Sequence, residues 1–192
     1  MNKIEKSIRP ALLAALLLFA LAPAVSAQGT LDRATTTGTI SGALDGAELE
    51  WRTLELEGED GLQNTANYDV MMDMIYNYTL QGHMEGAYTE GALAIAFSSF
   101  SGPLVDCPCE FTGEILHWTT SSMFRNVYAD YEAVITVVAA ELLEGGALRL
   151  VGTATGQLEF YESAMNPEPS GDAVSVILEF EIERATLEEA PL

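Results

Sequence analysis

Both cysteines of the chain lie in the stretch VDCPCEF, where one proline separates Cys107 from Cys109. Two thiols this close could form a disulfide, bind a metal ion or act as a redox pair. A redox pair needs positive charge beside the reactive thiol, but the neighbours here are Asp106 and Glu110. Residues i and i+2 of an extended strand are about 6.5–7 Å apart, at or beyond the limit of disulfide geometry. We therefore predict a tight turn closed by a local disulfide.

A metal site is the main alternative use of these thiols. Thiolate and thioether ligands favour copper(I), and adjacent His83 and Met84 in the stretch QGHMEG offer further borderline and soft ligands. Calcium would instead use an acidic turn, for which the candidates are Glu57, Glu59 and Asp60. Glutamates outnumber aspartates and no D-x-D-x-D-G loop occurs, so the acidity is more typical of a general surface property than of dedicated calcium loops. The sequence predicts no cofactor other than such a metal ion, a divalent cation on the acidic turn or copper(I) on the Met, His and Cys side chains.

Catalytic motifs are missing from the sequence. It contains no G-x-S-x-G nucleophile elbow, and its two histidines, His83 and His117, lie in unremarkable strand-like surroundings. A glycosidase needs two carboxylates across a cleft, and the sequence cannot single out one pair among so many. The sequence therefore favours a non-enzymatic protein, with a hydrolase that uses an unrecognised carboxylate pair as an alternative.

The best candidate for ligand binding is the stretch MFRNVYADY. It combines a guanidinium, an amide and two phenol rings in Arg125, Asn126, Tyr128 and Tyr131. Aromatic rings beside polar groups are typical of surfaces that bind sugars or proteins. We predict a loop-like, ligand-facing edge here, in a binding module for a glycan or a protein partner.

The elements that must position these residues are β-strands. In the segment 174–183, Val, Leu, Phe and Ile alternate with Ser and Glu, which indicates a strand with one apolar face. Asp45-Gly46 predicts a hairpin turn, and beyond it Trp51 alternates with charged neighbours and is expected in the core. In the segment 70–77 the alternation predicts a further strand, with Met72 and Met74 filling the core from one face.

About eight such strands and no amphipathic helix predict a single all-β domain, an antiparallel β-sandwich or jelly-roll-like fold. A small outer-membrane β-barrel is the alternative architecture, because its strands would alternate in the same way.

The N-terminus has the layout of a secretory signal peptide. Lys3, Lys6 and Arg9 precede an apolar run at 11–22, which is shorter than the roughly 20 residues that span a bilayer. Small residues follow at 25–27, so we predict a leader at 1–27 and an acidic domain at 28–192, located in the periplasm or outside the cell. After cleavage we expect no membrane insertion.

The charge of the chain excludes some partners. The full sequence has a formal net charge of −21, and the predicted leader holds three of the 8 basic residues. The remaining chain contains no lysine. Because so negative a surface repels phosphate backbones and anionic headgroups, nucleic acid is excluded as a partner.

Overall fold

The computed structural model describes residues 34–58, 61–100, 102–105, 107–121, 125–163 and 168–188. These residues form ten strands and a single turn of 3₁₀ helix, η1 (Glu144–Gly146). The strands are β1 (Thr35–Leu44), β2 (Ala47–Gly58), β3 (Gly61–Asn64), β4 (Ala66–Met71), β5 (Ile75–Gly82), β6 (Leu93–Ser99), β7 (Cys109–Trp118), β8 (Arg125–Leu142), β9 (Leu148–Ser163) and β10 (Val174–Glu188). The predicted all-β class is confirmed.

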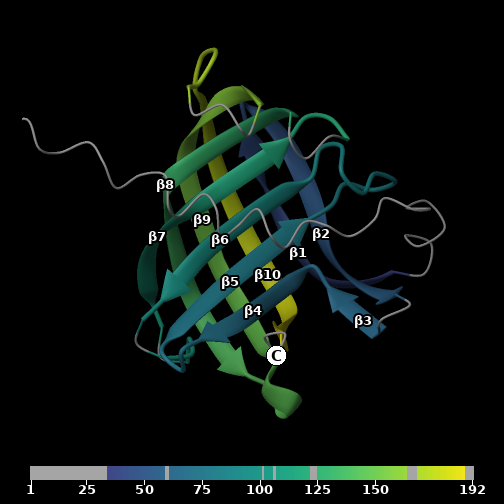
Figure 1. The fold of residues 1–192 in the computed structure, drawn as a ribbon, viewed down its shortest axis with the longest axis vertical. Helices are drawn as coiled ribbons and strands as arrows, with labels where there is room; N and C mark the ends of the chain where they lie inside the picture. The colour runs from purple at the N-terminus through teal and green to yellow at the C-terminus, as the bar shows by residue number, and fades with distance from the viewer. Residues whose placement is uncertain are drawn as a thin grey trace, which may run out of the picture.

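One sheet contains all ten strands, and it closes on itself through β10. This strand lies between β1 and β9, antiparallel to both, and its last residues, Thr186–Glu188, pair in parallel with β4. From β4 the sheet continues through β5, β6, β7 and β8 back to β9. In Figure 1, β4 to β7 cross in front of β1, β9 and β10, so the core lies between two layers of the same curved sheet.

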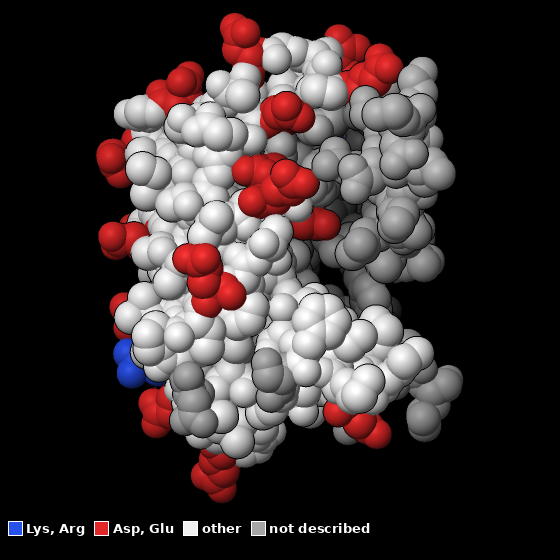
Figure 2. All heavy atoms as spheres, turned by 90° about the vertical axis from the view of Figure 1, so that its left-hand side faces the viewer, with Lys and Arg blue, Asp and Glu red and all other residues white. Residues whose placement is uncertain are grey.

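The alternating sequence of β10 decides which of its side chains enter this core. Val176, Leu178, Phe180 and Ile182 are buried, whereas the glutamates between them are exposed. Successive side chains of a strand point to opposite faces, so one face of β10 is apolar and the other is acidic. Figure 2 shows acidic side chains over much of one side of the molecule, where basic side chains are confined to one edge.

The hairpin predicted at Asp45-Gly46 is confirmed. Leu44 pairs with Ala47 across the turn, and both turn residues have left-handed backbone angles, with φ of 51° at Asp45 and 74° at Gly46. A two-residue turn of this kind matches the twist of the strands that it joins, and Asp-Gly tolerates the positive φ values. The turn places Trp51 of β2 in the core, where it is fully buried.

The predicted single strand over 70–77 is wrong. β4 ends at Met71, the chain turns at residues 72–74, and β5 returns antiparallel, with Met71 opposite Ile75. Val70 and Tyr76, on either side of the turn, both pack against the core. Met72 and Met74 do not fill the core as predicted, because they are 79% and 63% exposed.

β8 changes the face that it presents to the core partway along its length. In its second half Ala133, Ile135 and Val137 join the main core, whereas in its first half Tyr128 packs against that core. The register with β9 shifts between Ala129 and Val134, and the Asp130 carboxylate accepts the backbone N–H groups of Glu132 and Gln157, at 2.8 Å each. The Asp130 side chain thereby provides a hydrogen-bond acceptor for backbone N–H groups at the place where the β8–β9 register shifts.

The predicted leader, residues 1–27, lies outside the described residues. Within the part of the chain that is described, no helix is long and apolar enough to cross a membrane.

Candidate ligand-binding hollow at one end of the sheet

The hollow is a depression of about 470 Å³ where β8 begins and β9 ends. Arg125 is the first residue of β8, and it pairs with Ser163, the last residue of β9. The described residues that precede β10, 168–173, lie at the top of Figure 1. The hollow is lined by Arg125, Asn126, Phe160, Glu162 and Ser163. We refer to it below as the Arg125 hollow.

The backbone of Arg125 and Asn126 is held by the two threonines that follow β7. The Asn126 carbonyl accepts the Thr119 backbone N–H at 3.1 Å and the Thr119 hydroxyl at 2.8 Å. The Arg125 carbonyl accepts the Thr120 hydroxyl at 3.3 Å. Asn126 has φ of 55°, a left-handed conformation that asparagine tolerates better than most residues. The side chains of both residues therefore start from a fixed backbone.

Arg125 differs from two of the other arginines in its charge environment. Arg149 forms an ion pair with Glu181 at 2.9 Å, and Arg52 lies 3.6 Å from Glu50. Among the described residues, no carboxylate lies within ion-pair distance of Arg125. The Arg125 guanidinium offers several N–H donors in one plane, a geometry that suits a carboxylate or a pair of hydroxyls.

A row of aromatic rings extends from the Arg125 hollow into the core. The Phe160 ring, which lines the hollow, lies 5.0 Å from the Tyr128 ring. Tyr128 lies 6.5 Å from the ring of His117, and His117 lies 6.1 Å from Trp51, edge to face. Trp51 is fixed in turn, because its indole N–H donates to the Gly91 carbonyl at 2.6 Å. Phe160 is thus backed by packed rings, and its position is well defined.

The two histidines are buried and offer no acid–base chemistry at the Arg125 hollow. Burial lowers the pKa of His117, whose Nδ1 has no hydrogen-bond partner among the described residues. Burial also lowers the pKa of His83, whose Nδ1 lies 2.5 Å from the Tyr88 carbonyl oxygen and whose ring stacks on that of Tyr88. Neither histidine lines the hollow. Its lining residues are suited to hydrogen bonding and stacking.

The structure brings together two of the four residues predicted to bind a ligand. Arg125 and Asn126 line the hollow, whereas Tyr128 packs against the main core. Tyr131 packs on a separate cluster with Tyr161, whose ring lies 6.1 Å away. The predicted loop-like edge is wrong, because all four residues belong to strand β8.

Three lining residues, Phe160, Glu162 and Ser163, were not predicted from the sequence. They enter the hollow because β9 lies beside β8 in a register that pairs Arg125 with Ser163. Local alternation in the sequence does not reveal such a pairing between distant segments.

The predicted metal ligands lie apart. Glu57 is exposed near the end of β2, and Glu59 and Asp60 lie outside the described residues. His83 stacks on Tyr88, whereas the neighbouring Met84 packs against the core. In the described ranges, no three side chains of the His, Cys, Asp and Glu types lie close enough together to hold a metal ion.

Cys107 and Cys109 lie at disulfide distance, as predicted. Their Cα atoms are 4.8 Å apart, closer than an extended strand would place them. The turn that brings them together contains Pro108, whose peptide bond to Cys107 is cis. No free cysteine remains in the chain.

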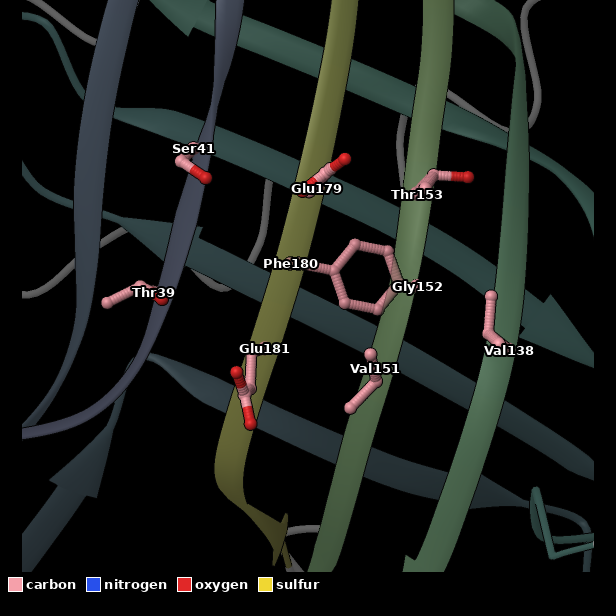
Figure 3. Close-up of a pocket in the computed structure, with 9 residues that line it drawn as sticks. All are labelled: Thr39, Ser41, Val138, Val151, Gly152, Thr153, Glu179, Phe180 and Glu181. Atoms are coloured by element: carbon pink, nitrogen blue, oxygen red, sulfur yellow. The ribbon is translucent and has the colours of Figure 1, made fainter.

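A second, smaller hollow of about 270 Å³ lies on a face of the sheet formed by β1, β8, β9 and β10. Figure 3 shows the Phe180 ring extending from β10 toward Gly152 of β9, its partner in the register. Thr39, Ser41 and the carboxylates of Glu179 and Glu181 surround this point. A Cβ atom at position 152 would point toward the buried Phe180 ring, so the glycine leaves room for this ring under the sheet.

Comparisons of the chain with protein families, curated proteins and solved structures found no match.

Proposed function

We propose that the protein is a non-enzymatic binding module that holds a glycan in the Arg125 hollow. The observation that carries the proposal is the combination of a guanidinium, an amide, a carboxylate and an aromatic ring around one depression of about 470 Å³. Sugars present hydroxyls that donate and accept hydrogen bonds, and they present flat C–H faces that pack on aromatic rings. The lining residues offer a partner for each of these groups.

Charge favours a sugar that carries a carboxylate, such as a uronic acid. The chain is strongly acidic, so most of its surface repels an anionic ligand. Arg125 is the exception among the lining residues, because it is a cation without a carboxylate partner among the residues described. A carboxylate bound to a guanidinium forms two parallel hydrogen bonds, which fixes the orientation of the ligand.

Location outside the cytoplasm belongs to the same proposal. It is supported by the leader predicted at 1–27 and by the cysteine pair, since disulfides persist in oxidising compartments. A secreted or periplasmic binding module would meet polysaccharides there.

The test is calorimetric titration of the purified protein with uronate-containing and neutral oligosaccharides, using Arg125→Ala and a matched control, Arg149→Ala. Losing one charge-assisted contact typically costs about 1.5–3 kcal/mol, so Arg125→Ala should weaken uronate binding about tenfold or more. Arg149→Ala removes the same charge from another part of the sheet and should bind as the parent does. Equal losses in both variants would show that only net charge matters, and binding unchanged by Arg125→Ala would place the glycan elsewhere.

A further inference from the structure

Three methionines lie together at the turn between β4 and β5. Met71, Met72 and Met74 are 45%, 79% and 63% exposed. Burying a methionine side chain stabilises a fold. Methionines that are exposed at three of four successive positions therefore contribute little to stability. The turn lies at the start of β5. Gly82, at the other end of β5, pairs with Leu93 of β6, Leu93 pairs with His117 of β7, and His117 pairs with Tyr128 near the start of β8. The turn therefore lies at the far end of these strands from the Arg125 hollow. Its chemistry is therefore separate from that of the Arg125 hollow.

The backbone of this turn is unfavourable for Met72. Met72 and Asp73 have φ values of 54° and 57°, both left-handed, and the Met74 N–H donates to the Met71 carbonyl at 3.2 Å. Turns with two left-handed central residues strongly prefer Asn-Gly, because most side chains are strained there. Neither core packing nor turn geometry accounts for methionine at position 72. Strain retained at an exposed position is a reason to look for function.

Metal coordination would explain why methionines occupy this exposed turn. Thioether sulfur is a soft, uncharged ligand that favours copper(I) over harder cations. The ends of a hydrogen-bonded β-turn lie within about 7 Å of each other, and each methionine side chain has three rotatable bonds with which its sulfur can reach a shared ion. Asp73 in the same turn and Asp69 on β4 add negative charge that balances a monovalent cation.

We propose that Met71, Met72 and Met74 form a binding site for a soft monovalent cation, copper(I), at the tip of the β4–β5 hairpin. The site needs the sulfur atoms, whereas a hydrophobic docking surface would need only apolar area. Leucine has nearly the volume and apolar character of methionine but no sulfur. Methionine-to-leucine substitutions therefore separate the two possibilities.

The experiment uses silver(I) in place of copper(I), because silver(I) is also soft and monovalent but needs no reductant that would open the Cys107–Cys109 disulfide. The purified protein, labelled with ¹³C at the methionine methyl groups, is titrated with silver nitrate in chloride-free buffer and followed by NMR. We expect the methyl signals of Met71, Met72 and Met74 to shift together and saturate at one silver ion per chain. The signal of Met84, which packs against the core, should stay in place and serves as the internal reference.

Two variants and one control test the assignment. The triple variant M71L/M72L/M74L should bind silver(I) at least about tenfold more weakly, while M84L should bind as the parent does. The variant M72N/D73G gives the turn its preferred residues, so it should fold at least as well as the parent and still lose affinity. The proposal is overturned if the turn methionines do not shift, if Met84 shifts instead, or if the triple variant keeps the parental affinity.

Discussion

Replacing Gly152 with alanine should destabilise the protein, although alanine is normally the better residue in a strand. A Cβ atom at position 152 would lie within 3.0 Å of both the Thr136 carbonyl oxygen and the Phe180 ring. Phe180 is only 2% exposed, so its ring cannot move into solvent. Alanine in place of glycine gains about 0.5–1 kcal/mol from the unfolded chain, and overpacking a buried position costs about 1–3 kcal/mol. Because one contact is with backbone, we take the upper part of that range and expect a net loss of about 2 kcal/mol.

The loss can be measured by thermal unfolding. For a chain of this size, about 2 kcal/mol corresponds to a decrease in Tm of roughly 4–8 °C. Thr155→Ala, an exposed change on the same strand, is the control and should leave Tm nearly unchanged. In a Phe180→Leu background the ring contact is relieved but the Thr136 carbonyl remains, so the added cost of Gly152→Ala should fall to about 1 kcal/mol. A Gly152→Ala protein that melts at or above the parental Tm would refute the reasoning.

Three further predictions follow from the core and the turns. Burial lowers the pKa of His83 and of His117 below the ordinary value of 6.5, so their contribution to stability is complete above that pH. As pH falls below 6.5, the unfolded chain binds protons that the folded one does not, and the loss of Tm between pH 7.5 and 5.5 should be smaller in a His83→Gln/His117→Phe variant. Burial raises the pKa of Glu114 and of Glu188, so protonation of these two carboxylates favours the folded state as pH falls. This effect is the same in the parent and in the histidine variant, so it does not change the comparison. Trp51→Phe removes the indole donor to the Gly91 carbonyl and leaves a cavity at a fully buried site, so the urea midpoint should fall by an amount equivalent to about 2–3 kcal/mol, with an unchanged slope. The variant M72N/D73G should raise Tm by a few degrees, corresponding to about 1 kcal/mol, and a decrease would contradict the strain inferred at the β4–β5 turn.

The sequence predicts those parts of the fold that local chemistry decides. The apolar face of β10 follows from strict alternation, and the β1–β2 turn follows from Asp45-Gly46. The β4–β5 turn was not predicted because the alternation of apolar and polar residues continues through it. Val70 and Tyr76 lie six positions apart and both pack against the core, so alternation continues across a reversal of the chain. The turn residues Met72 and Asp73 also lack the glycine or asparagine that usually signals such a turn.

The candidate site was predicted only in part, because it depends on contacts between distant segments. Arg125 and Asn126 are recognisable by their chemistry, but Phe160 and Glu162 reach them through the pairing of β8 with β9. The separation of Tyr128 from Tyr131 depends on a shift in that pairing, where Asp130 accepts two backbone N–H groups. A single sequence does not record which strands are neighbours or where their register shifts.

The position of β10 in the sheet also sets the order in which the protein can fold. It is the last strand in the described part of the chain, and it pairs with β1, β9 and β4. Until residues 174–188 have been synthesised, these three strands lack their shared neighbour and the sheet stays open. The growing chain therefore has a long interval with unpaired strand edges, which favour association between chains. Once β10 has been made, its pairing with these strands closes the sheet. A chain truncated before residue 174 would keep these strand edges unpaired and would be prone to association.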